Sequence, residues 1–240
     1  RLMYLDRVRL MFDKSPEIDG GKRTEFMEQI KDYQGIYTGE ERTQLEIGQS
    51  WLKEFDQLPQ IKKINSDSPL ATSKIGRAPK DSKAWGKSEI EVRGSIEEVF
   101  AFLFHFDSRA RTKSSDLEKT VVQENSLHNV ITYVCKKGAH IGVVELLPRD
   151  ALNSCIWKRT DENTIAFVAT STTHALKPIT PDRVRGSVPF AVKFQKLSES
   201  RCKLTYCLSL EMGSIPNTIA DFYMKNFLSL TETVQQYFQQ

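Results

Sequence analysis

Two places in this 240-residue sequence hold side chains of the types that do chemistry. Arg149 and Asp150 are adjacent and could contact a polar head group, whereas the usual role of such a pair is to fix a strand end by ion pairing. His174 could serve as a proton switch, because histidine titrates near neutral pH, and a structural histidine is the alternative. No GxSxG motif, glycine-rich phosphate loop or metal-ligand spacing accompanies them. We therefore expect no catalytic residues, no metal site and no cofactor.

Other polar residues fit ordinary structural roles. The run from Asp107 to Arg111 is similar to a phosphate-contacting loop, and a solvated loop with internal ion pairs is the alternative. The segment around Asp116 and Glu118 is too polar for shifted pKa values to be expected. The four cysteines form no CxxC pair and are expected as buried, reduced thiols in strands: Cys135, Cys155, Cys202 and Cys207.

Composition favours a globular protein without a nucleic-acid partner. Hydrophobic residues make up 39% and charged residues 27%, and the formal net charge is +3. No apolar run reaches the ~18 residues that span a membrane. We expect a monomeric, cytoplasmic protein. The sequence begins at Arg1, which is consistent with a piece of a longer chain.

The first third of the sequence predicts helices followed by a linker. Residues 1–36 are expected as a helical extension and residues 37–240 as the main domain. Thr38 and Glu41 form a capping box for a helix that Pro59 ends. One face of that helix is expected to pack on the back of a sheet and carries Ile47, Trp51, Phe55 and Leu58. Residues 65–83 have no periodicity and predict a basic surface linker, with transient contact to an anionic membrane surface as an alternative.

The remaining two thirds predict an α+β fold. A strand at 89–93 precedes a helix that begins at the Ser95–Glu98 capping box. Alternating strands are predicted at 120–123, 129–136, 142–147, 152–159, 164–172, 183–196 and 202–210. One long amphipathic helix follows, with Ser214 as its N-cap and Pro216 in its first turn. This order predicts a curved antiparallel sheet around the C-terminal helix, with an apolar hollow between them.

The segment from Thr173 to Asp182 is too long for a tight hairpin and carries two prolines. We expect it to act as a gate, with Thr173, His174, Pro178 and Pro181 as its residues.

An ordered set of short motifs resembles the START family, the steroidogenic-acute-regulatory-related lipid-transfer domains. The set comprises Ser95-Ile96-Glu97-Glu98-Val99-Phe100, Pro148-Arg149-Asp150 followed by Trp157, Ser171-Thr172-Thr173-His174, Val184-Arg185-Gly186 and Gly213-Ser214-Ile215-Pro216. The resemblance covers about residues 85–240 and the helix at 39–58. It implies a helix-grip fold, as in START and Bet v 1-like proteins, that holds one lipid or other hydrophobic small molecule.

The resemblance also suggests which residues contact the ligand. Apolar inward positions fit either core packing or a cavity wall, and the resemblance favours the wall for Phe104, Val134, Trp157, Phe167, Phe194, Tyr206, Leu208, Phe222, Tyr223 and Phe227. Arg149, Asp150 and Cys155 are expected as polar groups near this pocket. Sterol-carrying members place an arginine at the position of Cys155, so the pocket is expected to lack that charged anchor. A ligand-sensing or protein-docking module and a helix-grip enzyme are the alternatives.

Overall fold

The computed structural model describes residues 28–31, 33–66, 68, 70–77, 83–141, 144–211 and 217–239. Most of the predicted N-terminal extension and the predicted start of the last helix at Ser214 and Pro216 lie outside these residues. Residues 28–31 are helical, within the segment expected to be helical. The division into an extension and a main domain at residue 36 stays a prediction.

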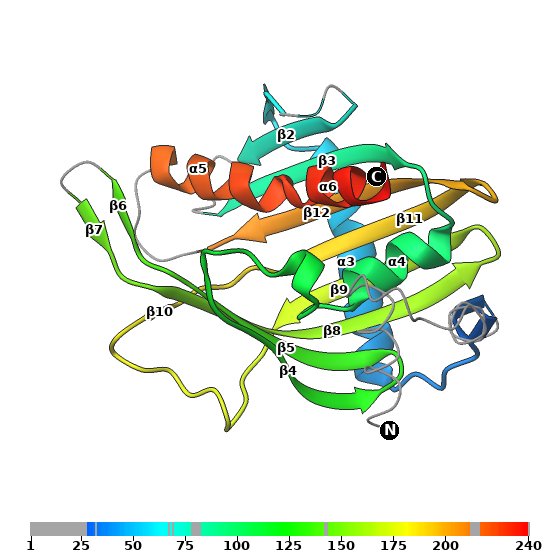
Figure 1. The fold of residues 1–240 in the computed structure, drawn as a ribbon, viewed down its shortest axis with the longest axis horizontal. Helices are drawn as coiled ribbons and strands as arrows, with labels where there is room; N and C mark the ends of the chain where they lie inside the picture. The colour runs from blue at the N-terminus through cyan, green and yellow to red at the C-terminus, as the bar shows by residue number, and fades with distance from the viewer. Residues whose placement is uncertain are drawn as a thin grey trace.

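A large twisted antiparallel sheet forms the centre of the molecule (Figure 1). Its strands follow the order β1-β2-β3-β12-β11-β9-β8-β5-β4, and the short β10 pairs with β8 in parallel. Their bounds are β1 Gln60–Ile64, β2 Thr72–Arg77, β3 Ala84–Val92, β4 Asp116–Ser126, β5 Asn129–Lys136, β8 Arg149–Asp161, β9 Thr164–Ser171, β10 Val184–Arg185, β11 Phe190–Ser198 and β12 Arg201–Leu210. The predicted curved antiparallel sheet is confirmed.

Helices cover both faces of this sheet (Figure 1). Helix α3 (Gly39–Asp56) lies on one face and contacts β8, β9, β11 and β12. Helices α4 (Ile96–Phe104), α5 (Asn217–Leu228) and α6 (Leu230–Phe238) lie on the other face, where most buried apolar residues gather. The short 3-10 helix η1 (Arg109–Arg111) follows α4. The sheet therefore separates a small core under α3 from a large core under α4, α5 and α6.

Both predicted capping boxes are present. The Thr38 hydroxyl accepts from the Glu41 amide while the Glu41 carboxylate accepts from the Thr38 amide, and Ser95 and Glu98 repeat the arrangement at α4. The predicted face of α3 is partly wrong, because Ile47 is exposed and the buried residues are Leu45, Gly48 and Phe55.

Three predicted segments differ from the structure. The predicted linker at 65–83 contains β2, whose buried positions carry Ser73, Ile75 and Gly76, so that only one of them is a large apolar residue. The predicted strand at 183–196 is two strands, β10 and β11, which belong to different neighbours in the sheet. Of the predicted strand at 142–147, Val144–Leu146 forms β7, which pairs with β6 (Ala139–Ile141) in a separate two-stranded sheet.

The predicted C-terminal helix is divided into α5 and α6 at Ser229. The Ser229 amide still donates to the Lys225 carbonyl at 3.0 Å, and the Thr233 amide donates to the Ser229 carbonyl at 3.0 Å. Because these bonds keep helical spacing across the division, the two helices act as one continuous element along β3.

Candidate ligand-binding site

The structure brings most of the predicted ligand residues into one cluster. Phe104, Trp157, Phe167, Phe194, Tyr206 and Leu208 are buried in the large core, and Val134, Tyr223 and Phe227 are partly buried and pack against it. Phe222 differs: its side chain is 53% exposed on α5, so it does not face the core. The ligand-contacting role of these residues stays a prediction.

Contacts between aromatic rings connect helix α4 and several strands within this cluster. The Phe100 ring lies 4.9 Å from Trp157, 5.6 Å from Phe194 and 5.4 Å from Phe104, between ring centroids. Phe190 on β11 lies 5.5 Å from Phe167 and 5.7 Å from Tyr206. These separations are those of favourable aromatic pairs. Phe190 is partly buried and was not among the predicted residues, although it alternates with Val192 and Phe194 on the same strand face.

Asp150 ties β8 to the segment that follows the predicted gate. Its buried carboxylate accepts from Arg185 Nε at 2.7 Å and Nη2 at 3.0 Å, and from the Tyr133 hydroxyl at 2.9 Å. The ion pair that fixes the start of β8 therefore joins Asp150 to Arg185 and not to the adjacent Arg149. Arg149 instead donates to the Leu147 carbonyl, and its guanidinium lies 5.8 Å from the Tyr223 ring centroid on α5. The Arg149 Nε is buried without a partner.

The predicted gate residues form an irregular loop between β9 and β10 (Figure 1). The His174 ring is 2.8 Å from the Gln123 side-chain oxygen on β4, and Lys177 forms an ion pair with Glu118. Pro178 and Pro181 are exposed. The loop thus rests on β4 at its middle and is fixed by Arg185 at its end. Its role as a gate stays a prediction.

Cys155 on β8 is buried beside groups from β5 and η1. Its sulfur is 3.3 Å from the Thr132 hydroxyl on β5. Burial raises the pKa of the Cys155 thiol to about 12, an effect that Thr132 and Arg111 oppose. All four cysteines are buried and free, as the sequence predicts.

A cation close to Cys155 comes from the 3-10 helix η1 that follows α4. Burial lowers the pKa of Arg111 to about 10, and the groups that oppose this include Tyr206 and Cys155 in the core. Arg111 donates to the Leu103 carbonyl, while its Nε is buried and without a partner. The run from Asp107 to Arg111 is therefore not the solvated loop that was one interpretation of the sequence.

Lys119 on β4 lies next to Arg111. Its Nζ donates to the Arg111 carbonyl at 2.6 Å and lies 4.9 Å from the Phe106 ring centroid. Burial lowers the pKa of Lys119 to about 6, and Arg111 lowers it further while Asp116 opposes the shift. Lys119 departs from the expectation of ordinary pKa values in this segment, because its side chain is partly buried.

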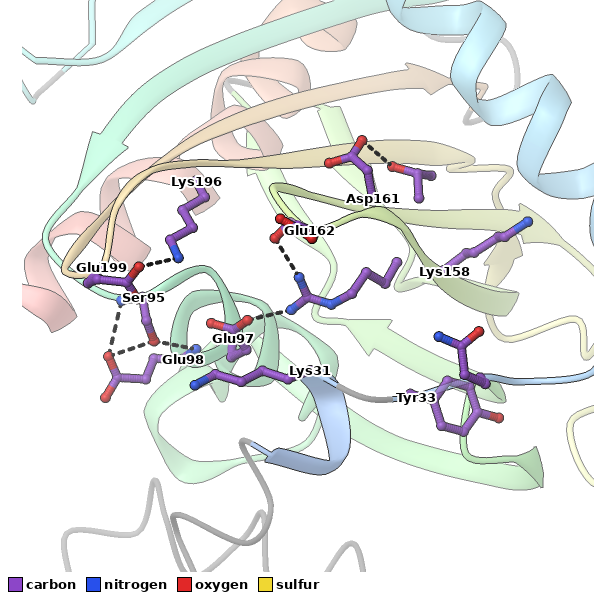
Figure 2. Close-up of a pocket in the computed structure, with 13 residues that line it drawn as sticks. Lys31, Tyr33, Ser95, Glu97, Glu98, Lys158, Asp161, Glu162, Lys196 and Glu199 are labelled. Atoms are coloured by element: carbon purple, nitrogen blue, oxygen red, sulfur yellow. Dashed lines mark hydrogen bonds and ion pairs between the residues drawn. The ribbon is translucent and has the colours of Figure 1, made fainter.

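A surface groove lies at the C-terminal end of β8 (Figure 2). It has a volume of about 930 Å³ and is lined by Lys31, Tyr33, Gln34, Ser95, Glu97, Glu98, Lys158, Arg159, Thr160, Asp161, Glu162, Lys196 and Glu199. Arg159 pairs with Glu97, and Lys196 pairs with Glu199. None of the predicted ligand residues lines this groove, and its charges largely neutralise one another. It does not fit a hydrophobic ligand.

Comparisons with known proteins identify the architecture. No protein-family model matches the sequence, and neither does any curated protein. Among solved structures, human StAR-related lipid transfer protein 5 superposes with a TM-score of 0.67 at 16% identity, covering 85% of this chain and 98% of that one. The protein has the START fold. Human STARD10 gives a TM-score of 0.65 at 15% identity, covering 86% and 81%.

A bacterial START structure is similar as well. The STAR-related lipid transfer protein from Xanthomonas axonopodis gives a TM-score of 0.60 at 12% identity, covering 75% of this chain and 99% of that chain. At these identities the likeness concerns the fold. In the described part of this START-fold chain, no helix combines the length and apolar character needed to cross a bilayer.

Proposed function

We propose that this protein binds one lipid molecule between its sheet and the helices α4 and α5, for transfer or sensing. The observation that carries the proposal is a set of apolar side chains that pack on the large core and yet keep accessible surface. Val134 and Val121 belong to the β4–β5 edge, Phe190 to β11, and Tyr223 and Phe227 to α5. A hydrophobic ligand bound at the core would cover these partly buried side chains.

Solvent exclusion would provide the binding energy. Covering apolar surface stabilises a complex by about 25 cal/mol per Å². Most small-molecule sites in proteins are lined by apolar groups with a few polar ones. The few polar groups here would be Arg149 and Asn153, whose Nε and Oδ1 atoms are buried without partners. The START fold of proteins named for lipid transfer supports the ligand class. Nothing in the described residues favours the enzyme or protein-docking alternatives.

A matched pair of phenylalanines on α5 tests the proposal. Phe227 packs on the core, whereas Phe222 is exposed. We expect Phe227→Ala to weaken binding of an NBD-labelled long-chain alcohol about 10-fold, from the loss of about 60 Å² of apolar contact. Phe222→Ala should leave the affinity within about 2-fold. Equal effects of the two substitutions, or no binding by the unmodified protein, would refute the proposal.

A further inference from the structure

The large sheet ends at a short and exposed strand. Strand β1 is the last in the strand order and pairs on one side with β2. Its residues from Gln60 to Lys63 are exposed, and Ile64 is partly buried. Among the described residues, no strand lies along the other side of β1. Alternate residues of such an edge strand point their N–H and C=O groups away from the sheet, where a further strand can pair with them.

Three lysines stand in a row across this edge of the sheet. Lys63 on β1 is directly opposite Lys74 on β2, which is directly opposite Lys87 on β3. Asp56 of α3 lies 2.8 Å from the Lys87 Nζ. Lys63 and Lys74 form no ion pair with any described residue. Like charges directly opposite one another weaken strand pairing, so an acid placed beside Lys63 would stabilise the edge.

The side chains of β1 define the sequence pattern of a strand that would fit beside it. Ile61 and Lys63 point to one face of the sheet, and Lys62 and Ile64 point to the other. Residues of an added strand point to the same face as the residues that they oppose. The matching strand therefore carries acids opposite the two lysines and apolar residues opposite the two isoleucines. The order apolar, acid, acid, apolar is the same in both strand directions.

Two other partners fit this edge less well. In a pair of copies, the antiparallel register that sets Ile61 opposite Ile64 also sets Lys62 opposite Lys63, so the two edges repel each other. An anionic membrane surface attracts lysines, but it offers the backbone groups of β1 no partners in strand geometry. The exposed backbone and the lysines together favour an acidic strand.

We propose that β1 binds an acidic, extended peptide segment of another protein as an additional strand of the sheet. The backbone groups of β1 provide the affinity, and Lys62 and Lys63 select acidic side chains. The proposal does not rest on lipid binding, because no predicted ligand residue lies on β1 or β2.

Three labelled peptides test the proposal by fluorescence anisotropy with the full chain. The first has the order threonine, valine, glutamate, glutamate, valine, threonine and should bind with a Kd of about 100 μM. The second has glutamines in place of the glutamates and should bind about 10-fold more weakly, since it loses two ion pairs. The third has the first sequence with methylated backbone amides, which cannot donate to β1, and should not bind. Equal binding of the first and third peptides, or no binding of the first at about 1 mM, would overturn the proposal.

Variants of β1 assign the binding to the edge. The double variant Lys62→Gln with Lys63→Gln should bind the first peptide about 10-fold more weakly. Lys137→Gln, at an exposed lysine next to β5, should change the affinity less than about 2-fold. The thermal midpoint of the double variant should not fall, because the repulsion between Lys63 and Lys74 is removed. Equal peptide affinity of the folded double variant and the unmodified protein would overturn the assignment.

Amide exchange of the unmodified protein tests the same edge without a variant. The first peptide should slow exchange in Gln60–Ile64 and leave the other edge strand, Asp116–Ser126, unchanged. Slowed exchange at Asp116–Ser126 alone would contradict the proposal. Phosphatidylserine vesicles that recruit the protein through Lys62 and Lys63, together with no binding of the peptide, would identify a membrane-binding edge and also overturn it.

Discussion

Lys119 shows how a single partly buried amine can oppose folding. Its lowered pKa means that the unfolded chain binds more protons than the folded protein between about pH 6 and the ordinary value of 10.5. Folding stability rises with pH wherever the unfolded state binds more protons. The penalty from Lys119 is therefore largest below pH 6 and shrinks as the pH rises toward 10.5.

Lys119→Met should remove this penalty. We expect the free energy of unfolding at pH 7 to increase by about 1–3 kcal/mol, after the lost bond to the Arg111 carbonyl is counted. The gain should be smaller at pH 9.5. Urea unfolding at the two pH values measures it, with Lys137→Met at an exposed position as the control. A gain that is independent of pH, or a loss at pH 7, would contradict the assigned burial of Lys119.

Asp150 illustrates the opposite case of a paired buried charge. The Asp150 side chain is 1% exposed, and the side chain of its partner Arg185 is 16% exposed. Asp150→Asn should destabilise the protein by about 3 kcal/mol, because a buried pair that loses one partner leaves an uncompensated charge. Asp182→Asn, at a 62% exposed ion pair with Arg183, should change stability by less than about 0.5 kcal/mol. Thermal or urea unfolding that gives equal effects would rule out the anchoring role of Asp150.

At the scale of elements, α3 approaches the sheet through a glycine. A Cβ on Gly48 would lie 2.4 Å from both methyl carbons of Val168 on β9. Because the β-branched Val168 is stiff, Gly48→Ala should destabilise the protein by about 1–3 kcal/mol despite alanine's higher helix propensity. Gly39→Ala, where nothing lies within 4 Å, should be neutral or slightly stabilising. Denaturant unfolding midpoints of the two variants measure these effects. A stabilising effect of Gly48→Ala would mean that α3 does not approach Val168 this closely.

The loop between β9 and β10 should be less protected than the strands around it. Its hydrogen bonds are turn-like, such as the Lys177 amide to the His174 carbonyl at 3.1 Å, and it joins no strand ladder. Local opening of such segments costs less than opening of core strands. Amide exchange across Thr173–Asp182 should be faster than across Leu204–Leu210. Equal protection of the two segments would argue against a gate.

Sequence patterns predicted the elements whose inward residues are large and apolar. The strand at Asn129–Lys136 has the predicted bounds, and α4 begins at its predicted capping box. The sequence did not predict strand β2, because the buried Ser73 interrupts the apolar alternation that marks a strand. Its hydroxyl bonds to the Ser88 hydroxyl at 2.9 Å. The predicted strand at 183–196 is interrupted between β10 and β11, where Gly186 and Pro189 lie, because proline cannot donate to a ladder.

The candidate site could be predicted in part. Nine of the ten predicted apolar residues gather at the large core. Strand alternation predicts the positions on strands, and helical periodicity predicts Phe104, Tyr223 and Phe227. Arg111 and Lys119 could not be found this way, because their burial depends on how the segment after α4 folds over β4. Phe222 was misplaced because helical periodicity does not fix how far around α5 the core reaches.

For the whole molecule, the central claim is that the START fold here holds one lipid. Its most direct test is native mass spectrometry of the protein purified from cells, followed by delipidation and reloading with oleic acid. We predict a single adduct of lipid mass per chain, lost on delipidation and restored by reloading, with Phe227→Ala showing less of it than Phe222→Ala. Protein that carries no adduct from cells and gains none on reloading would contradict the account.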